Sequence, residues 1–239
     1  MENAKRKSAN GTGEKAEAFE RTSRKNLLLV DEHPVVREGL KRLLESERDL
    51  TVCAEADSPE EAIRLLNREN PDLVVMELSV HGMSGLELIK NIRHVRKPAL
   101  VLVLSMHDET LWTERVMRAG ACGFVSKSEK PKALLAKIHL ALAGGLCVSD
   151  RMSERLLRKL TGQLSANDDG GIGGLGDREM EVLHLMSRAL STHEIASSMH
   201  VSVKTVEAHR ENLKRKLKLN TAAELLRFAV IRFTHASGI

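Results

Sequence analysis

Short apolar runs, unbroken by polar positions, mark the first two-thirds of the chain. A strand that is buried on both faces has this pattern. The runs cover Leu27–Val30, Leu73–Met76, Ala99–Leu104 and Phe124-Val125. Apolar residues at helical spacing stand between them, in the stretches 35–44, 62–66, 86–92, 112–117 and 134–142. This alternation predicts a doubly wound α/β domain around a parallel sheet.

Polar residues follow the runs where ligands collect in such folds, at the carboxyl ends of the strands. Counted along the predicted sheet, Asp31 and Glu32 end the first strand, Glu77 the third and Ser105 the fourth, and Ser126-Lys127 follow the fifth. Carboxylates suit Mg²⁺, and a hydroxyl and a lysine suit a phosphoryl group. The sequence therefore predicts one pocket with parts for both.

The pattern changes from Leu175 onward, where four helices and almost no strand are predicted. Asp177 can cap the first helix, and Ser191 or Thr192 can cap the second. His200-Val201 then forms a turn, and Ser202 caps a longer helix with an apolar stripe at Val203, Val206, Leu213 and Leu217. That helix carries an excess of cations over acids, which a phosphate backbone attracts.

The first two-thirds of the chain resemble the receiver domain of bacterial two-component response regulators. The motifs are LVDEHPVVREGL, PDLVVMELSVHGMSGLELI, VLVLSMHDE and GACGFVSK. The resemblance implies a five-stranded, flavodoxin-like fold. It aligns Asp31 and Glu32 with the metal-binding acids, Glu77 with the phosphoacceptor, Ser105 with the switch hydroxyl, Phe124 with the switch aromatic and Lys127 with the phosphate-contacting lysine.

Three residues depart from the receiver pattern. Glu77 replaces the acceptor aspartate, Glu32 replaces the second acid, and His81 replaces a proline. Phosphoryl transfer depends on positioning, and a displacement of about 1 Å can cost roughly a hundredfold in rate. Our hypothesis is that Glu77 is not phosphorylated efficiently and reaches Ser105 and Lys127 as a partial mimic of phosphoaspartate. The alternative is a residual structural contact with Lys127 in a receiver that serves only for dimerisation.

The pocket requires no cofactor under either reading. Mg²⁺ demands ligands at about 2.0 to 2.1 Å, which the longer acids disturb. Asp31, Glu32 and Glu77 therefore define at most a weak Mg²⁺ site.

The C-terminal block resembles the LuxR-type helix-turn-helix domain through REMEVL, LSTHEIASSMHVS and TVEAHRENLKRKL. The resemblance implies double-stranded promoter DNA as a partner and a homodimer on a two-fold site, whereas a histidine kinase partner stays open. It places Lys204, Glu207, Ala208 and Glu211 at base edges, Arg210, Lys214 and Arg215 at phosphates, and Thr205 in the same DNA-binding set. Alternatively, Glu207 and Glu211 stabilise the helix, through a pair of Glu211 with Arg215.

Composition and charge complete the division of the chain. We expect a disordered basic arm over 1–25, a receiver-like domain over 26–145, a linker over 146–174 and the DNA-binding domain over 175–239. The linker combines a short helix, Asp150–Leu160, with the flexible segment GQLSANDDGGIGG. The three cysteines are unpatterned and predict reduced thiols, and no stretch suits a membrane. We therefore expect a cytoplasmic protein associated with the bacterial nucleoid.

The sequence thus predicts a DNA-binding transcriptional regulator whose receiver works without phosphorylation. The first alternative is a conventional phosphorelay regulator that is phosphorylated in the acidic pocket. A remote alternative is a metal-dependent phosphate-ester enzyme, but the chain has no glycine-rich phosphate loop and no nucleophile-base pair. His193 and His209 lack neighbours at metal-ligand spacing and are predicted to be surface or packing residues.

Overall fold

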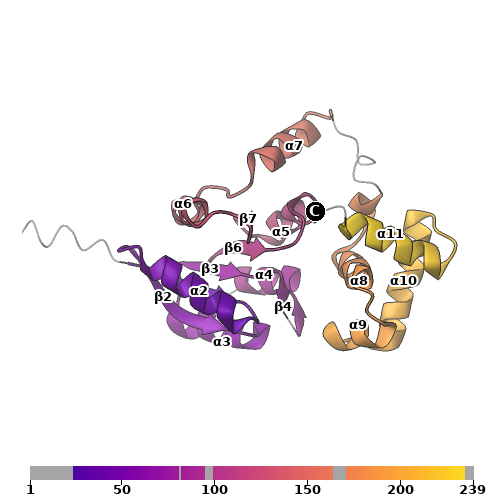
Figure 1. Ribbon diagram of the computed structural model, residues 1–239, viewed down its shortest axis with the longest axis horizontal. Coiled ribbons are helices and arrows are strands. Elements are labelled where there is room, and N and C mark those ends of the chain that lie inside the picture. The colour runs from indigo at the N-terminus through magenta and orange to yellow at the C-terminus, as the bar shows by residue number, and fades with distance from the viewer. Residues whose placement is uncertain (1–23, 81, 95–98, 164–170, 235–239) are drawn as a thin grey trace, which may run out of the picture.

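The computed structural model describes residues 24–80, 82–94, 99–163 and 171–234, which form an α/β part and a helical part in contact (Figure 1). The elements of the α/β part are β1 (Lys25–Val30), α2 (Pro34–Glu45), β2 (Leu50–Ala56), α3 (Pro59–Glu69), β3 (Leu73–Met76), β4 (Ser79–Val80), β5 (Met83–Ser84), α4 (Gly85–Arg93), β6 (Leu100–Ser105), α5 (Glu109–Ala119), β7 (Gly123–Ser126) and α6 (Pro131–Leu142). After these come α7 (Asp150–Leu160), a 3₁₀ turn (Ile172–Gly174), α8 (Asp177–Ser187), α9 (Thr192–Ser198), α10 (Val203–Leu217) and α11 (Ala222–Thr234).

The main sheet has five strands in the order β2-β1-β3-β6-β7, and every neighbouring pair is parallel. The chain moves outward from β1 to β2 and then crosses to β3 on the other side of β1. The order therefore reverses between β1 and β3, where ligand sites form in doubly wound sheets. The predicted fold class is confirmed.

Alternate residues of each central strand pack on opposite faces of the sheet. In β1, Leu27 and Leu29 join the core under α2 and α6, whereas Leu28 and Val30 join the core under α3, α4 and α5. Both faces are covered, so neither set of side chains meets water. This is why the central strands are apolar throughout.

The second strand, β2, was not located from the sequence because it lies at the edge of the sheet. Leu50, Val52 and Ala56 are buried, but the residues between them are only half-buried. Glu55 instead pairs with Lys41 of α2, with 2.8 Å between the charged atoms. An edge strand with one partly wet face does not produce an unbroken apolar run.

The helical part contains the four predicted helices, and two of their three predicted caps are present. Ser191 accepts a hydrogen bond from the Glu194 N–H at 3.3 Å, and Ser202 accepts one from the Thr205 N–H at 3.1 Å. The predicted cap of α8 was wrong, because the N-cap residue is Gly176. The Asp177 carboxylate instead contacts Lys90 of α4 at 2.7 Å, across the boundary between the two parts.

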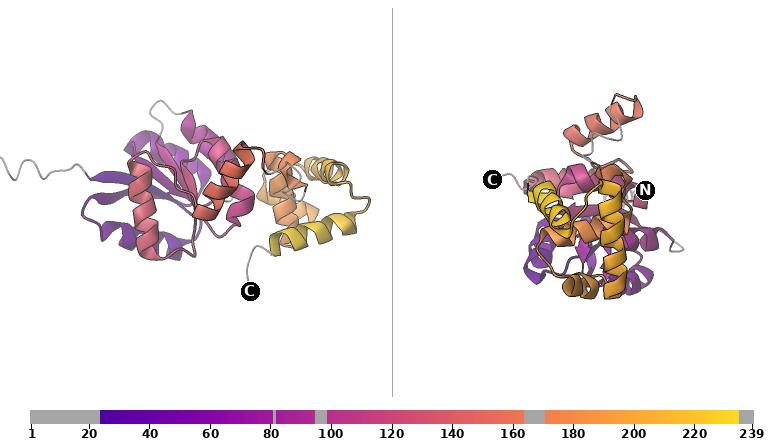
Figure 2. Two further views of the ribbon diagram at one scale, coloured as in Figure 1. Left: turned by 90° about the horizontal axis from the view of Figure 1, so that it is seen from above. Right: turned by 90° about the vertical axis from the view of Figure 1, so that its right-hand side faces the viewer.

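The linker helix α7 has the predicted bounds and lies at one edge of the molecule, away from α8 to α11 (Figures 1 and 2). Part of the predicted flexible segment, residues 164–170, lies outside the described residues. At the end of this segment Ile172 is packed against the receiver: it is only 4 % exposed, and its carbonyl accepts a 3.0 Å hydrogen bond from Arg115 of α5. In the described residues, no helix is long and apolar enough to cross a membrane.

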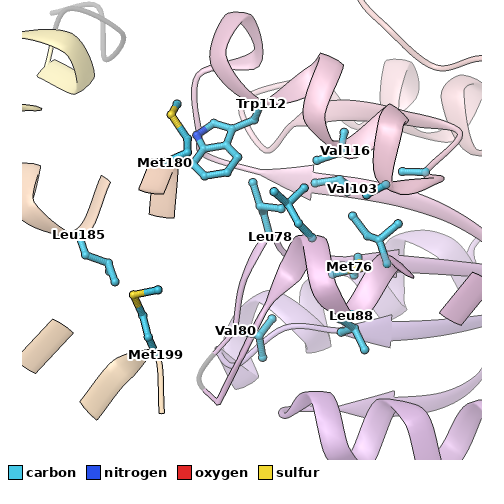
Figure 3. Close-up of a cluster of buried hydrophobic side chains, with 14 of the residues drawn as sticks. Met76, Leu78, Val80, Leu88, Val103, Trp112, Val116, Met180, Leu185 and Met199 are labelled. Atoms are coloured by element: carbon cyan, nitrogen blue, oxygen red, sulfur yellow. The ribbon is translucent and has the colours of Figure 1, made fainter. Parts of the chain in front are cut away.

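One apolar cluster joins the two parts. Figure 3 shows Trp112 of α5 beside Met180 of α8, and Leu78 and Val80 on the side that faces Leu185 and Met199. Around it, Arg178 of α8 forms an ion pair with Glu87 of α4, and Lys90 pairs with Asp177. The contact between the parts is therefore apolar at its centre and charged at its rim.

Candidate functional site

Asp31, Glu77 and Lys127 stand one position beyond their strands and continue the strand hydrogen bonding, whereas Ser105 is the last residue of β6. The N–H of Asp31 donates to the Ala56 carbonyl at 3.1 Å, that of Glu77 to the Val30 carbonyl at 2.8 Å, and that of Lys127 to the Ser105 carbonyl at 2.9 Å. The carboxyl edge of the sheet thus brings together Asp31, Glu77, Ser105 and Lys127, as predicted from strand order.

Glu77 makes the two contacts that its length predicts. Its carboxylate is buried, with the residue 7 % exposed, and Oε1 accepts a short hydrogen bond from the Ser105 hydroxyl. Oε1 also accepts the N–H of Leu78 at 2.6 Å and that of Ser79 at 3.3 Å. Oε2 lies 2.8 Å from the Lys127 ammonium. Both oxygens are therefore engaged, one by hydrogen-bond donors and one by a cation.

The Lys127 ammonium bridges the two buried acids, because it also lies 2.5 Å from Oδ2 of Asp31. Burial alone would raise the pKa of Asp31, but hydrogen bonds from Lys127 and from the His33 backbone outweigh it and hold this pKa below its ordinary value. Burial would lower the pKa of Lys127, and its bonds to Asp31 and Glu77 hold that pKa above its ordinary value instead. Asp31 and Lys127 are therefore both charged at neutral pH.

The Lys127 ammonium lies 2.5 Å from an oxygen of Asp31 and 2.8 Å from an oxygen of Glu77, between the two acids that would share a Mg²⁺ ion. The other oxygen of Asp31 accepts the His33 N–H at 2.9 Å. Mg²⁺ needs near-octahedral oxygen ligands, and these carboxylates offer it few free lone pairs.

The remaining predicted pocket residues lie at different depths. Glu32 stands at the rim, where its carboxylate comes within 4.0 Å of His33 and lines two cavities between the parts. Phe124 is buried in the core under α3, α4 and α5. His81 lies outside the described residues.

His107, which was not predicted from the sequence, touches Ser105 from the loop after β6. Its Nδ1 lies 2.6 Å from the Ser105 Oγ, and its Nε2 lies 3.1 Å from the Ser79 Oγ. The ring packs edge-on against Trp112, with 5.5 Å between centroids. Burial lowers the pKa of His107 although the Glu77 charge opposes this. Its place two residues after Ser105 was the one available sequence signal.

His184 of α8 was also missed, and it meets His107 across the boundary between the two parts. The two Nε2 atoms are 3.0 Å apart. Burial, the neighbouring His107 and Arg188 lower the pKa of His184 to about 3, so the imidazole is neutral. A cavity of about 490 Å³ lies beside the pair, with Glu77 and Lys127 on one wall and His184, Arg188 and Phe233 on the other. No local motif links two histidines so far apart in sequence.

The second candidate site is α10, which lies on the side of the helical part that faces away from the sheet (Figures 1 and 2). Val206 and Leu213 are buried on its inner side. Six of the eight predicted DNA-binding residues are exposed on it: Lys204, Thr205, Glu207, Ala208, Glu211 and Arg215. Arg210 and Lys214 are half-buried. The predicted DNA-reading surface is thus uncovered in this structure.

Local contacts on α10 differ in part from those predicted. Glu211 pairs with Lys214 at 2.9 Å and not with Arg215, which donates to the Asn212 side chain instead. Arg210 donates to the Thr192 hydroxyl at 2.6 Å and so ties α10 to the start of α9. His193 is exposed and His209 half-buried, and among the described residues neither belongs to a cluster of potential metal ligands.

Two family descriptions match the chain. Residues 27–139 match the response regulator receiver domain, and residues 174–229 match bacterial regulatory proteins of the luxR family. A nitrate/nitrite response regulator homolog of Haemophilus influenzae is 33 % identical over 204 residues, covering 84 % of this chain and 95 % of the relative. The transcriptional activator ExaE of Pseudomonas putida is 34 % identical, covering 85 % of this chain and 95 % of that protein.

Solved structures of similar proteins include RcsB of Salmonella. RcsB bound to the promoter rprA in the presence of the phosphomimetic BeF3⁻ is 25 % identical, with a TM-score of 0.64 over 87 % of this chain and 98 % of that one. A structure of two RcsB dimers bound to two parallel DNAs has a TM-score of 0.63 and 25 % identity over 87 % of this chain and 100 % of that one.

Proposed function

Because the chain belongs to the response regulators that join a receiver domain to a LuxR-family DNA-binding domain, we propose that it regulates transcription without phosphorylation of its receiver. It is a DNA-binding regulator and not an enzyme. The observation that carries the proposal is the placement of the Glu77 carboxylate, which by itself engages both Ser105 and Lys127.

The extra methylene of glutamate supplies the reach. A phosphoryl group on a shorter acceptor would present oxygens to the switch hydroxyl and the lysine, and in this chain the two carboxylate oxygens of Glu77 take those places. The imitation is partial, because a carboxylate has one charge and two oxygens, whereas a phosphoryl group has a charge of about −1.5 to −2 and three oxygens. Glu77 therefore holds the contacts of the phosphorylated state with less charge.

The same contacts make Glu77 a poor nucleophile. Oε1 accepts hydrogen bonds from Leu78, Ser79 and Ser105, and Oε2 is paired with Lys127. Attack on a phosphodonor requires an oxygen in line with the leaving group and a metal ion to neutralise the transferred charge. Here an attack by Oε2 would first have to break its ion pair with Lys127.

Promoter DNA is the partner that the C-terminal domain supports. The exposed face of α10 presents cations and acids together, which suits phosphate contacts beside hydrogen bonds to base edges. Leu226, Val230 and Ile231 of α11 are also exposed apolar side chains. Exposed apolar side chains that gather on one element can mark a protein interface, and these support a homodimer on a two-fold site.

The test measures affinity for a two-fold duplex, selected from a random-sequence library with the wild-type chain. Wild type, Glu77→Ala and Glu77→Asp are compared with and without acetyl phosphate and Mg²⁺. We expect wild-type affinity to be indifferent to the donor, Glu77→Ala to bind more weakly, and Glu77→Asp to respond to the donor.

Each other outcome selects a different reading. Stoichiometric phosphorylation of Glu77, or donor-dependent binding by the wild type, would restore the conventional phosphorelay and overturn the proposal. Equal affinity of wild type and Glu77→Ala would rule out mimicry of phosphoaspartate, and the receiver would then serve only for dimerisation.

A further inference from the structure

We propose that the Glu77 carboxylate fixes the direction of a hydrogen-bond chain that runs through Ser105 and His107 to His184 of the DNA-binding domain. The inference rests on the proposed function in one respect, that Glu77 remains an unmodified carboxylate. His107 is then a positioning residue, which carries the state of position 77 across the boundary between the domains.

The direction of the hydrogen bonds is determined first at Ser105. A carboxylate beside an ammonium can only accept hydrogen bonds, so the single hydroxyl proton of Ser105 points to Glu77. The Ser105 oxygen then has only lone pairs left for His107. It accepts the His107 N–H at 3.2 Å, and it lies 2.6 Å from the ring Nδ1. Nδ1 of His107 must therefore carry a proton.

A neutral imidazole has one N–H group, so Nε2 of His107 is an acceptor. Two groups face this nitrogen, the Ser79 hydroxyl at 3.1 Å and Nε2 of His184 at 3.0 Å. His184 must donate, and its own proton is therefore on Nε2. The burial that lowers the pKa of both histidines keeps them neutral.

The environment of His184 Nδ1, at the far end of the hydrogen-bond chain, agrees with this assignment. Nδ1 of His184 is buried and has no hydrogen-bond partner within the described part of the chain. A proton on this nitrogen would be buried without an acceptor, which is costly. The assignment leaves the nitrogen unprotonated.

This chain of hydrogen bonds connects the acceptor position with the DNA-reading helix α10 through rigid elements. His184 belongs to α8, and α8 packs against both α10 and α11. Hydrogen bonds that are shielded from water are stronger and polarise one another. A change at position 77 therefore reaches the orientation of the DNA-binding domain through four side chains.

The direct test is nitrogen-15 NMR of the imidazoles in the full-length protein, assigned with His107→Gln and His184→Gln. We expect His107 to be protonated on Nδ1, the rarer tautomer, and His184 on Nε2. In Glu77→Ala, Ser105 is free to donate to His107, and the His107 tautomer should change. A wild-type His107 protonated on Nε2, or rapid averaging of tautomers, would overturn the inference while leaving phosphorylation independence intact.

The energetic test is a double-mutant cycle that combines Glu77→Ala with His184→Phe. Trp112 is the one tryptophan of the sequence and packs against His107, so its emission in a urea titration reports separation of the domains. Each single variant should lower the urea midpoint. The double variant should lower it by less than the sum of the shifts of the two single variants. Far-ultraviolet circular dichroism at zero urea establishes that each variant is folded.

Lys90→Gln is the matched control for the cycle. Lys90 pairs with Asp177 at the same boundary but has no contact with the chain of hydrogen bonds. Its effect should add to that of Glu77→Ala. We also expect Glu77→Ala and His184→Phe to change promoter affinity in the same direction, by about fivefold or more. Additive shifts for Glu77→Ala with His184→Phe, or opposite changes in affinity, would show that the two residues act separately.

Discussion

At the scale of single residues, one methylene group decides which side chains the carboxylate at position 77 reaches. The carboxylate of Glu77 spans from the end of β3 to both Ser105 and Lys127, and its position could be predicted because strand ends meet at one edge of the sheet. His107 and His184 could not be predicted in the same way. They lie on different domains, and their contact depends on how the domains pack.

His184 makes the stability of the joined domains depend on pH. Its pKa is about 3 in the joined domains, because burial and the neighbouring His107 and Arg188 disfavour the imidazolium, whereas the ordinary value is 6.5. The separated form therefore binds a proton that the joined form rejects. The stabilisation is complete above the ordinary value of 6.5 and is lost as the pH falls towards 3.

We accordingly expect acid to favour separation of the domains, by at most about 1.4 kcal/mol per pH unit for this one proton. Trp112 emission followed from about pH 7.5 to about pH 5.5 measures the effect. The other charged or titratable groups facing the two cavities beside His184 are Glu32, His33, Glu77, His107, Asp108, Lys127, Glu181, Arg188, Glu194 and His200. His184→Phe should flatten the profile, and an unchanged profile in that variant would assign the effect to these neighbours.

At the scale of elements, hydrophobic periodicity and N-cap residues predicted the helices and strands whose positions are determined by local interactions. The central strands were found because both of their faces are buried, and α10 was found because Ser202 caps it before an apolar stripe. Features that depend on partners distant in sequence were not predicted correctly. The edge strand β2 has one half-wet face, Asp177 pairs with Lys90 of α4 and does not cap α8, and the buried Ile172 is bound at its carbonyl by Arg115 of α5.

The exposed face of α10 yields a prediction about DNA reading. Glu207→Ala should cost about 1–3 kcal/mol on the selected duplex and little on unrelated DNA, because a base contact is lost. Arg215→Ala should weaken binding to all sequences and reduce the salt slope by about 1, because a phosphate contact is lost. Filter-binding isotherms at several salt concentrations separate the two.

Arg227→Ala on α11 is the control for these variants, since it removes an exposed cation outside α10. If Glu207→Ala lowers helix stability and leaves sequence preference unchanged, Glu207 is a helix-stabilising residue and not a base reader.

At the scale of the whole molecule, α5 connects the two domains. The Arg115 guanidinium binds the carbonyls of Ile172 and Leu175, each at 3.0 Å, and lies 3.4 Å from Asp177. These contacts fix the end of the linker against the receiver, directly before α8 begins. The docking of the DNA-binding domain therefore depends on a residue that belongs to neither predicted site.

Arg115→Ala should destabilise the joined arrangement by about 1.5–3 kcal/mol, because charged hydrogen bonds to two carbonyls are lost. A larger radius of gyration in small-angle X-ray scattering, with an earlier Trp112 transition in urea, is the expected result. Arg118→Ala removes a neighbouring, exposed arginine of α5 that pairs only with Glu114 in the ion pairs described, and it should have little effect. Equal effects of the two variants would contradict this role of Arg115.

The outward orientation of α10 has a consequence for how the protein is used in time. A helix that already faces solvent can meet a promoter without any earlier unmasking event, and a carboxylate cannot be removed by a phosphatase. Occupancy of the target sites would then follow the number of copies in the cell. Synthesis and degradation of the protein, rather than a chemical signal on it, would set when its genes respond.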